Sequence, residues 1–290
     1  MIQTAPILFL LAASLGPARP AGPPTDLRAL VATELAFAKQ TSERGIKDGF
    51  LAYLAEGSVV FRPGPVDARA VYAKLKPSPT LLVWHPAYAW ISMSGDLGYT
   101  TGPWTVFKSR GEKAPSGWGH FVTLWKRQAD GGFKAALDAG VSHAAPAGEE
   151  PVFAPAQAPS PAMAAQPNAA ARAEEELRGV ESRLAGESAA KGYPAGIGTY
   201  LGPDIRLYRA GEFPAVGLER AFELARKYDG RWRQKPDRLI ASESGDLAYV
   251  YGLMERVPDG AQAAFLRIWR RAADGRWRLS LDLVDPLPAS

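Results

Sequence analysis

The sequence predicts an α+β protein built from two tandem cone-shaped barrels, each with N-terminal helices packed on a curved antiparallel sheet. The first reason is a repeat, because residues 94–102 read SGDLGYTTG and residues 244–252 read SGDLAYVYG. A second repeat comes after each of these, since residues 121–138 match residues 265–282 at 8 of 18 positions. The other reason is the order of patterns: helical periodicity comes first and alternating strands come after it, in both copies. Two similar copies in one order indicate a duplicated domain.

The elements of the first copy are predicted from spacing and turn signals. Apolar residues at helical spacing begin after Thr25 and Asp26 and end before Gly45, which predicts the first helix. Asp130-Gly131 between alternating apolar residues is a hairpin signal. Helices are then expected at 47–55 and 67–75, and strands at 58–62, 81–93 (with a bend at Pro86), 97–107, 118–127 and 132–141.

The second copy repeats this plan. Its expected helices are 177–190 and 218–228, and its expected strands are 205–208, 238–243, 247–256, 262–271 and 276–284. Between them, residues 231–235 read RWRQK. A basic run around one aromatic residue resembles a single-strand nucleic-acid reader, but five residues are too few, and a solvated loop is the favoured interpretation.

Composition sets limits on the chemistry. The chain has 290 residues, 47% hydrophobic and 22% charged, which is enough for two globular domains. The absence of cysteine excludes disulfides, thiolate metal sites and a cysteine nucleophile. The net charge of +4 is shared between both copies, so no nucleic-acid partner is expected.

The domain plan has four segments. Residues 1–21 are a predicted signal peptide, because they hold a short apolar run and small residues suited to cleavage, although the first six residues carry no basic side chain. Export to the periplasm or medium is therefore expected, with no membrane insertion beyond the leader. The predicted domains are 26–143 and 177–285, joined by an Ala/Pro-rich linker at 144–173.

Both copies resemble the nuclear transport factor 2-like superfamily. The resemblance lies in the order of elements, the phrase SGDLGYTTG, and the closing pattern of Trp125, Asp130-Gly131 and Leu137-Asp138. More narrowly, the chain is similar to the SnoaL-like branch and to domain of unknown function 4440. The resemblance implies a cone-shaped barrel with a cavity at its mouth. It implies no single activity, since such proteins include isomerases, cyclases, dehydratases and non-catalytic binders.

Four residues of the first copy are candidates for acid–base chemistry. His85 and His120 titrate near neutral pH, Asp138 would be a general base in an apolar cavity, and Tyr99 would donate to a substrate oxygen. The structural interpretation is favoured for each. In particular, strand alternation groups Asp138 with Lys134 on a polar face, which would keep its pKa ordinary.

Four tryptophans are the candidates for ligand contact: Trp84, Trp90, Trp104 and Trp118. A cone lined by them would suit a flat apolar molecule. The second copy has Gln234, Ile240, Met254 and Gln262 at these positions, so it is less equipped for a pocket. No metal site and no cofactor are predicted.

Three functions stay open. The main expectation is an exported protein that binds a small apolar organic molecule in its first domain. The alternative is a cofactor-free isomerase, dehydratase or cyclase, which would require ionisable groups to converge inside the first cavity. The third is a non-catalytic interaction module, in which the copies pair as an intramolecular pseudo-dimer or the chain forms a homodimer.

Overall fold

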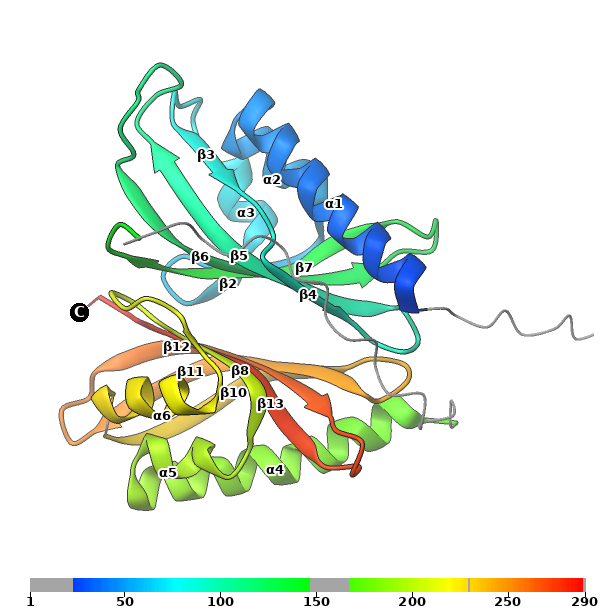
Figure 1. Cartoon of the computed structure of the whole chain (residues 1–290), viewed down its shortest axis with the longest axis vertical. Coiled ribbons are helices and arrows are strands. Elements are labelled where there is room, and N and C mark those ends of the chain that lie inside the picture. The colour runs from blue at the N-terminus through cyan, green and yellow to red at the C-terminus, as the bar shows by residue number, and fades with distance from the viewer. Residues whose placement is uncertain (1–22, 147–166, 229, 289–290) are drawn as a thin grey trace, which may run out of the picture.

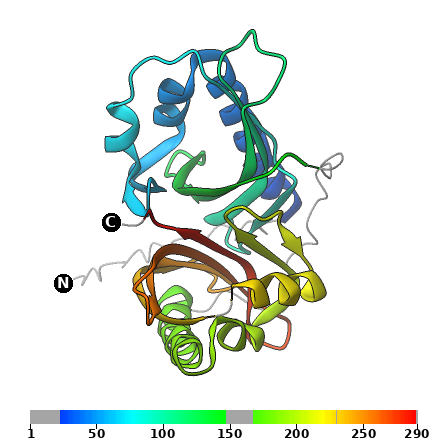
Figure 2. The ribbon, with the colours of Figure 1, turned by 90° about the vertical axis from the view of Figure 1, so that its left-hand side faces the viewer.

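In the computed structural model, residues 23–146, 167–228 and 230–288 are described. They form four layers, in which two sheets face each other and helices cover the outer face of each sheet (Figure 1). Figure 2 shows the same layers from the side, with each sheet curved around its own helices. The predicted α+β class, with helices on two curved sheets, is confirmed.

The first half has three helices, α1 (Pro23–Arg44), α2 (Ile46–Tyr53) and α3 (Ala68–Ala73). Its strands are β1 (Leu54–Phe61), β2 (Pro65–Asp67), β3 (Leu81–Trp84), β4 (Tyr88–Ile91), β5 (Leu97–Phe107), β6 (Gly117–Arg127) and β7 (Phe133–His143). They are ordered β2-β1-β7-β6-β5-β3, with β4 also paired to β5. The expected strand 81–93 is thus two strands separated at Pro86, which has no amide hydrogen for the ladder.

The second half repeats this arrangement. Its helices are α4 (Ala169–Lys191), α5 (Tyr193–Gly198) and α6 (Leu218–Lys227). Its strands are β8 (Leu201–Arg209), β9 (Ala215–Val216), β10 (Arg231–Ala241), β11 (Leu247–Val257), β12 (Gln262–Arg271) and β13 (Trp277–Pro286), in the order β10-β11-β12-β13-β8-β9.

Three local expectations need correction or lie outside the described residues. Helix α4 begins at Ala169, inside the expected linker 144–173, and α5 was not predicted. The segment 231–235, expected to be a solvated loop, is the start of β10, and its Trp232 is buried. The expected leader and residues 147–166 of the linker lie outside the described residues.

A tight helix pair shapes each half. Gly45, with φ of 94°, lets the chain turn from α1 into α2, and Gly192, with φ of 97°, does the same between α4 and α5. A Cβ at Gly49 would lie 2.5 Å from the Cα of Thr41, so only glycine allows α2 to cross α1 this closely. This crossing seats α2 against the open end of the sheet.

A bulge in β7 decides which way Asp138 points. Leu124 pairs with Leu137 but Trp125 pairs with Ala135, so Ala136 is the extra residue. Leu137 therefore packs between the sheets while Ala135 packs under the helices. The expected grouping of Asp138 with Lys134 is wrong: the Lys134 ammonium donates to a carbonyl at the end of α2, and Asp138 turns into a cavity.

The last strand of the second half carries the same bulge. A register shift between Ile268 and Trp269 splits a face that strand alternation predicts to be continuous. Trp277 and Leu279 pack under the helices, and Leu281 packs between the sheets.

The repeated Ser-Gly-Asp turns meet each other across the two sheets. The Ser94 amide donates to the Ser244 hydroxyl at 3.1 Å, and the Ser244 amide donates to the Ser94 hydroxyl at the same distance. The carboxylates reciprocate as well: Asp246 accepts from the Met93 amide, and Asp96 accepts from the Glu243 amide. These residues serve the turns, as expected, and also join the halves through a nearly symmetric contact.

Candidate functional site

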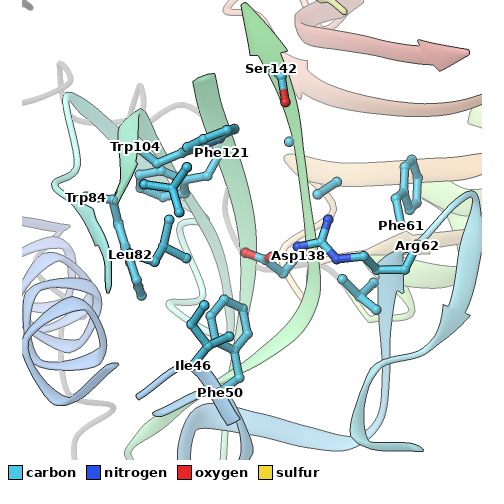
Figure 3. A pocket seen from close by; sticks show the side chains of 14 residues that line it. Ile46, Phe50, Phe61, Arg62, Leu82, Trp84, Trp104, Phe121, Asp138 and Ser142 are labelled. Carbon is cyan, nitrogen blue, oxygen red and sulfur yellow. The ribbon is translucent and has the colours of Figure 1, made fainter. Parts of the chain in front are cut away.

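The first half contains a cavity of about 280 Å³ between α2, the ends of β1 and β3, and strands β5 to β7. Aromatic and aliphatic side chains form most of its wall. The lining residues are Ile46, Phe50, Val60, Phe61, Arg62, Leu82, Trp84, Trp104, Val106, Phe121, Asp138, Ala139, Gly140 and Ser142. Figure 3 shows the aromatic group on one side, Arg62 on the other, and the carboxyl group of Asp138 between them.

Asp138 is the carboxyl group of this cavity. Its Oδ2 accepts from the hydroxyl of Thr123 at 3.0 Å. Burial raises the pKa of Asp138 to about 6, although the Thr123 hydrogen bond and the charge of Arg62 both act to lower it. A carboxyl with such a pKa exchanges protons close to neutral pH, which an ordinary surface aspartate does not.

Glu34 is a second carboxyl group, directly behind the cavity wall, and no role was predicted for it. It lies on α1, is fully buried, and accepts hydrogen bonds from the indoles of Trp84 and Trp125 and from the hydroxyl of Thr100. Burial raises the pKa of Glu34 to about 7, and the nearby charge of Asp138 adds to the shift.

A sequence signal for Glu34 was present. Leu30, Glu34 and Phe37 are spaced at i, i+4 and i+7, so the carboxylate falls on the apolar face of α1. A charged side chain on a buried face needs partners or a shifted pKa, and either outcome marks it for attention.

Comparison with solved structures finds small proteins that match less than half of this chain each. A ketosteroid isomerase-like protein from Erwinia carotovora atroseptica is 19% identical over 40% of this chain and 97% of its own, with a TM-score of 0.32. A nuclear transport factor 2-like protein of unknown function from Pseudomonas putida is 17% identical over 41% and 89%, with a TM-score of 0.35. A third, from Novosphingobium aromaticivorans, is 16% identical over 41% and 85%, with a TM-score of 0.33.

Solved structures that this chain is similar to include proteins described as nuclear transport factor 2-like and as ketosteroid isomerase-like. These are the kinds of protein that the repeated sequence also resembles. No protein-family model and no curated protein matches the sequence, so the narrower domain of unknown function 4440 assignment stays a prediction. These likenesses say nothing of activity.

Two of the four predicted tryptophans line the cavity. Trp84 and Trp104 form part of the aromatic wall. Trp90 lies between the sheets instead, with the guanidinium of Arg270 4.0 Å from its ring centre. Trp118 is also outside the lining of this cavity.

Of the four predicted acid–base residues, only Asp138 faces the cavity. The side chain of His85 is exposed, outside the lining. His120 faces the second half, with its ring centre 5.6 Å from that of Tyr208, and its Nδ1 lies 2.8 Å from the Nε2 of His143 on β7. The Tyr99 hydroxyl meets Ser280 between the sheets. The structure therefore does not bring the four together.

Strand alternation explains this separation. His120 and Phe121 are consecutive on β6, so one side chain faces the second half while the other lines the cavity. Burial and the nearby His143 and His85 lower the pKa of His120 to about 3, which keeps its imidazole neutral at physiological pH.

Metal ligands do not gather in the part of the chain that the structure describes: no three His, Asp or Glu side chains there are placed to hold a metal ion. Likewise, none of the helices described is long and apolar enough to cross a membrane.

Proposed function

We propose that the first half binds a small, largely apolar organic molecule in the cavity beside Asp138. The observation that carries this proposal is one carboxyl group set into a mostly aromatic and aliphatic wall, whose other polar side chains are Arg62 and Ser142. Ligand pockets commonly combine apolar walls, which drive binding, with a few polar groups, which orient the molecule. A volume of about 280 Å³ suits a molecule of one or two rings.

Closing the cavity from within tests this proposal. Thr123 of β6 lies next to Asp138 of β7. Thr123→Arg would therefore place a long side chain into the cavity, where its guanidinium can pair with the Asp138 carboxylate. Ligand-observed NMR with benzyl alcohol, indole and 2-naphthol should show binding to the wild type and none to this variant. Ser78→Arg, in an exposed loop, is the matched control and should bind as the wild type does.

Circular dichroism must first show that Thr123→Arg is folded. Equal binding by folded Thr123→Arg and wild type would contradict the proposal, as would a wild type that binds none of the three probes.

A second candidate is proton transfer by Asp138 acting as a general base. The raised pKa of about 6 in apolar surroundings favours it, because a base works best when its pKa is near the working pH. His120 and Tyr99 lie outside the cavity and are not its partners. Deuterium exchange at the methyl group of acetophenone, followed by NMR, should be accelerated by the wild type and not by Asp138→Asn. Equal rates would exclude this candidate.

The second half and the N-terminus complete the proposal. The reciprocal contacts of the Ser-Gly-Asp turns support a pseudo-dimer in which the second half is a structural partner of the first. We also propose export, on the strength of the apolar run at 7–13. Comparing the mass of the mature protein, purified from its host, with that of the full chain tests export: an intact N-terminus would contradict it.

A further inference from the structure

In the part of the second half that the structure describes, the framework of the cavity recurs, but an arginine side chain fills the corresponding space. In both halves the first helix carries a buried glutamate that accepts from the indole of a tryptophan on the sheet. The glutamate is Glu34 with Trp125 in the first half, and Glu181 with Trp269 in the second. These pairs show which residues of the two halves correspond to each other.

The aspartates of the bulged strands correspond in the same way. Asp138 pairs with Thr123 on the neighbouring strand, and Asp282 pairs with Arg267. A small hydroxyl side chain in the first half is thus replaced by a guanidinium in the second. Arg267 is fully buried.

The guanidinium of Arg267 fills the centre of the second half. It donates to Glu181, and its Nε lies 3.3 Å from Asp282. It also donates to Gln234 at 2.6 Å and to Tyr193 at 3.3 Å. Its carbon Cζ lies 4.4 Å from the ring centre of Phe265.

Four of the residues that contact Arg267 have cavity-lining counterparts in the first half. Asp138 stands for Asp282. Phe121 stands for Phe265, since both lie two residues before the position of Thr123 or Arg267.

Two further counterparts complete the set. Ile46 stands for Tyr193, because each is the first residue after the turning glycine. Trp84 corresponds to Gln234. Trp84 pairs with Trp104 and Gln234 pairs with Met254, and these two partners hold the same position in the repeat. All four first-half residues line the cavity, so the cavity occupies the place of the Arg267 side chain.

Charge is balanced inside the second half but not inside the first. Arg209 and Arg267, both fully buried, pair with Asp282 and Glu181. Buried charges are stable only when paired in this way.

In the first half, Glu34 accepts from neutral donors, and the side chain of Arg62 beside Asp138 is exposed. Burial raises the pKa of Glu34 and of Asp138, so protonation removes part of the negative charge of these two carboxyls. In the second half, Arg267 neutralises the corresponding charge.

We infer that the ligand of the first-half cavity carries an organic cation, an ammonium, amidinium or guanidinium group on a small apolar body, and that this group sits against Asp138. The inference rests on the proposed binding function and names the class of its ligand. The cation takes the place of the Arg267 guanidinium, with a carboxylate on one side and the rings of Phe121 and Trp84 on the other. The apolar body contacts the remaining wall.

Three probes with one ring and different charge test the inference: benzamidinium, benzyl alcohol and benzoate. Isothermal titration calorimetry on the full chain should give benzamidinium an affinity about tenfold or more above that of benzyl alcohol, with benzoate weakest. Asp138→Asn should remove this preference for benzamidinium over benzyl alcohol. Asp130→Asn, in the exposed turn after β6, is the matched control and should keep the preference.

The pH dependence gives a readout that a merely structural role of Asp138 would not move. The charged or titratable groups around Asp138 are Glu34 of α1, Arg62 after β1 and Tyr72 of α3. Because a cation prefers the ionised carboxyl, benzamidinium affinity should rise from about pH 5 to about pH 7, while benzyl alcohol affinity stays flat.

The outcomes separate the two proposals. If benzyl alcohol binds as tightly as benzamidinium, the inference of a cationic ligand is wrong, but the proposed binding function is still supported. A preference for benzamidinium that survives in Asp138→Asn also overturns the inference. Failure of every probe to bind the wild type contradicts both proposals together.

Discussion

At the residue scale, Glu34 links the core of the first half to its cavity. Its carboxyl holds the indole of Trp84, whose ring forms part of the cavity wall. The same carboxyl accepts from Trp125, which is fully buried in the core. A change in the charge of Glu34 therefore acts on stability and on the shape of the wall.

Glu34 should make the protein less stable as pH rises. Its folded pKa of about 7 lies above its ordinary value of 4.5, so the folded state binds the proton more tightly. The stabilisation is complete below the ordinary value and is lost as pH passes through the folded value. The loss is about 3 kcal/mol, and Glu34→Gln should remove it from urea unfolding curves measured between about pH 5 and about pH 8.

The control for this prediction is Glu43→Gln, an exposed carboxylate on the same helix. The unfolding free energy of Glu43→Gln should depend on pH as that of the wild type does. Asp138, whose pKa is also raised, contributes a slope of the same sign that remains in both variants. An unchanged slope in Glu34→Gln would show that Glu34 titrates normally.

At the element scale, the bulge of the last strand and one position of the neighbouring strand distinguish the two halves. The bulge turns Asp138 and Asp282 inward in both. The neighbouring strand, β6 or β12, then decides whether a cavity forms: Thr123 leaves space, and Arg267 fills it. One residue type in equivalent strands thus decides whether this particular space is open or filled.

Arg267→Thr should destabilise the second half strongly. It removes the cation shared by Glu181 and Asp282, both of which stay buried. Breaking a buried ion pair from one side costs about 3–5 kcal/mol, which urea denaturation would measure. Arg233→Thr, at an exposed position of β10, should change the unfolding free energy little. Similar losses in both variants would show that the buried network carries no special stability.

At the scale of the whole molecule, the two sheets share one apolar layer. Residues of both halves form it, including Leu124 and Leu137 of the first and Leu266 and Leu281 of the second. Polar contacts surround this layer, among them a cluster in which Tyr88 and Arg270 both meet Asp204. A buried layer of this kind keeps the halves from moving independently.

The reciprocal turn contact can be measured by a double-mutant cycle. Ser94→Ala and Ser244→Ala each remove one hydroxyl of the pair, whose oxygens lie 2.8 Å apart. The double variant should lose less unfolding free energy than the sum of the two single losses, by about 0.5–1.5 kcal/mol. The reason is that the second substitution removes a hydrogen bond that the first has already broken. Ser94→Ala combined with Ser182→Ala, on the exposed face of α4, should be additive. Additivity in the first pair would mean that the turns do not meet.

The repeat, the order of helices and strands and the α+β class could be predicted from the sequence alone. These depend on periodicity and on local turn residues such as Asp130-Gly131, which act over short stretches of chain. The sequence also placed Trp84, Trp104 and Asp138 among the candidates for the site. The export signal stays a prediction.

Which of the candidate residues lie close together depends on how the two sheets assemble. Asp138 faces the cavity because a bulge at Ala136 breaks the alternation of its strand, and a bulge has no signature in this sequence. Trp90, Tyr99 and His120 lie outside the candidate site because their side chains pack against the second half. These contacts join residues far apart in the chain. Burial of a side chain against a distant strand is a property of the assembled sheets, so it could not be read from local spacing.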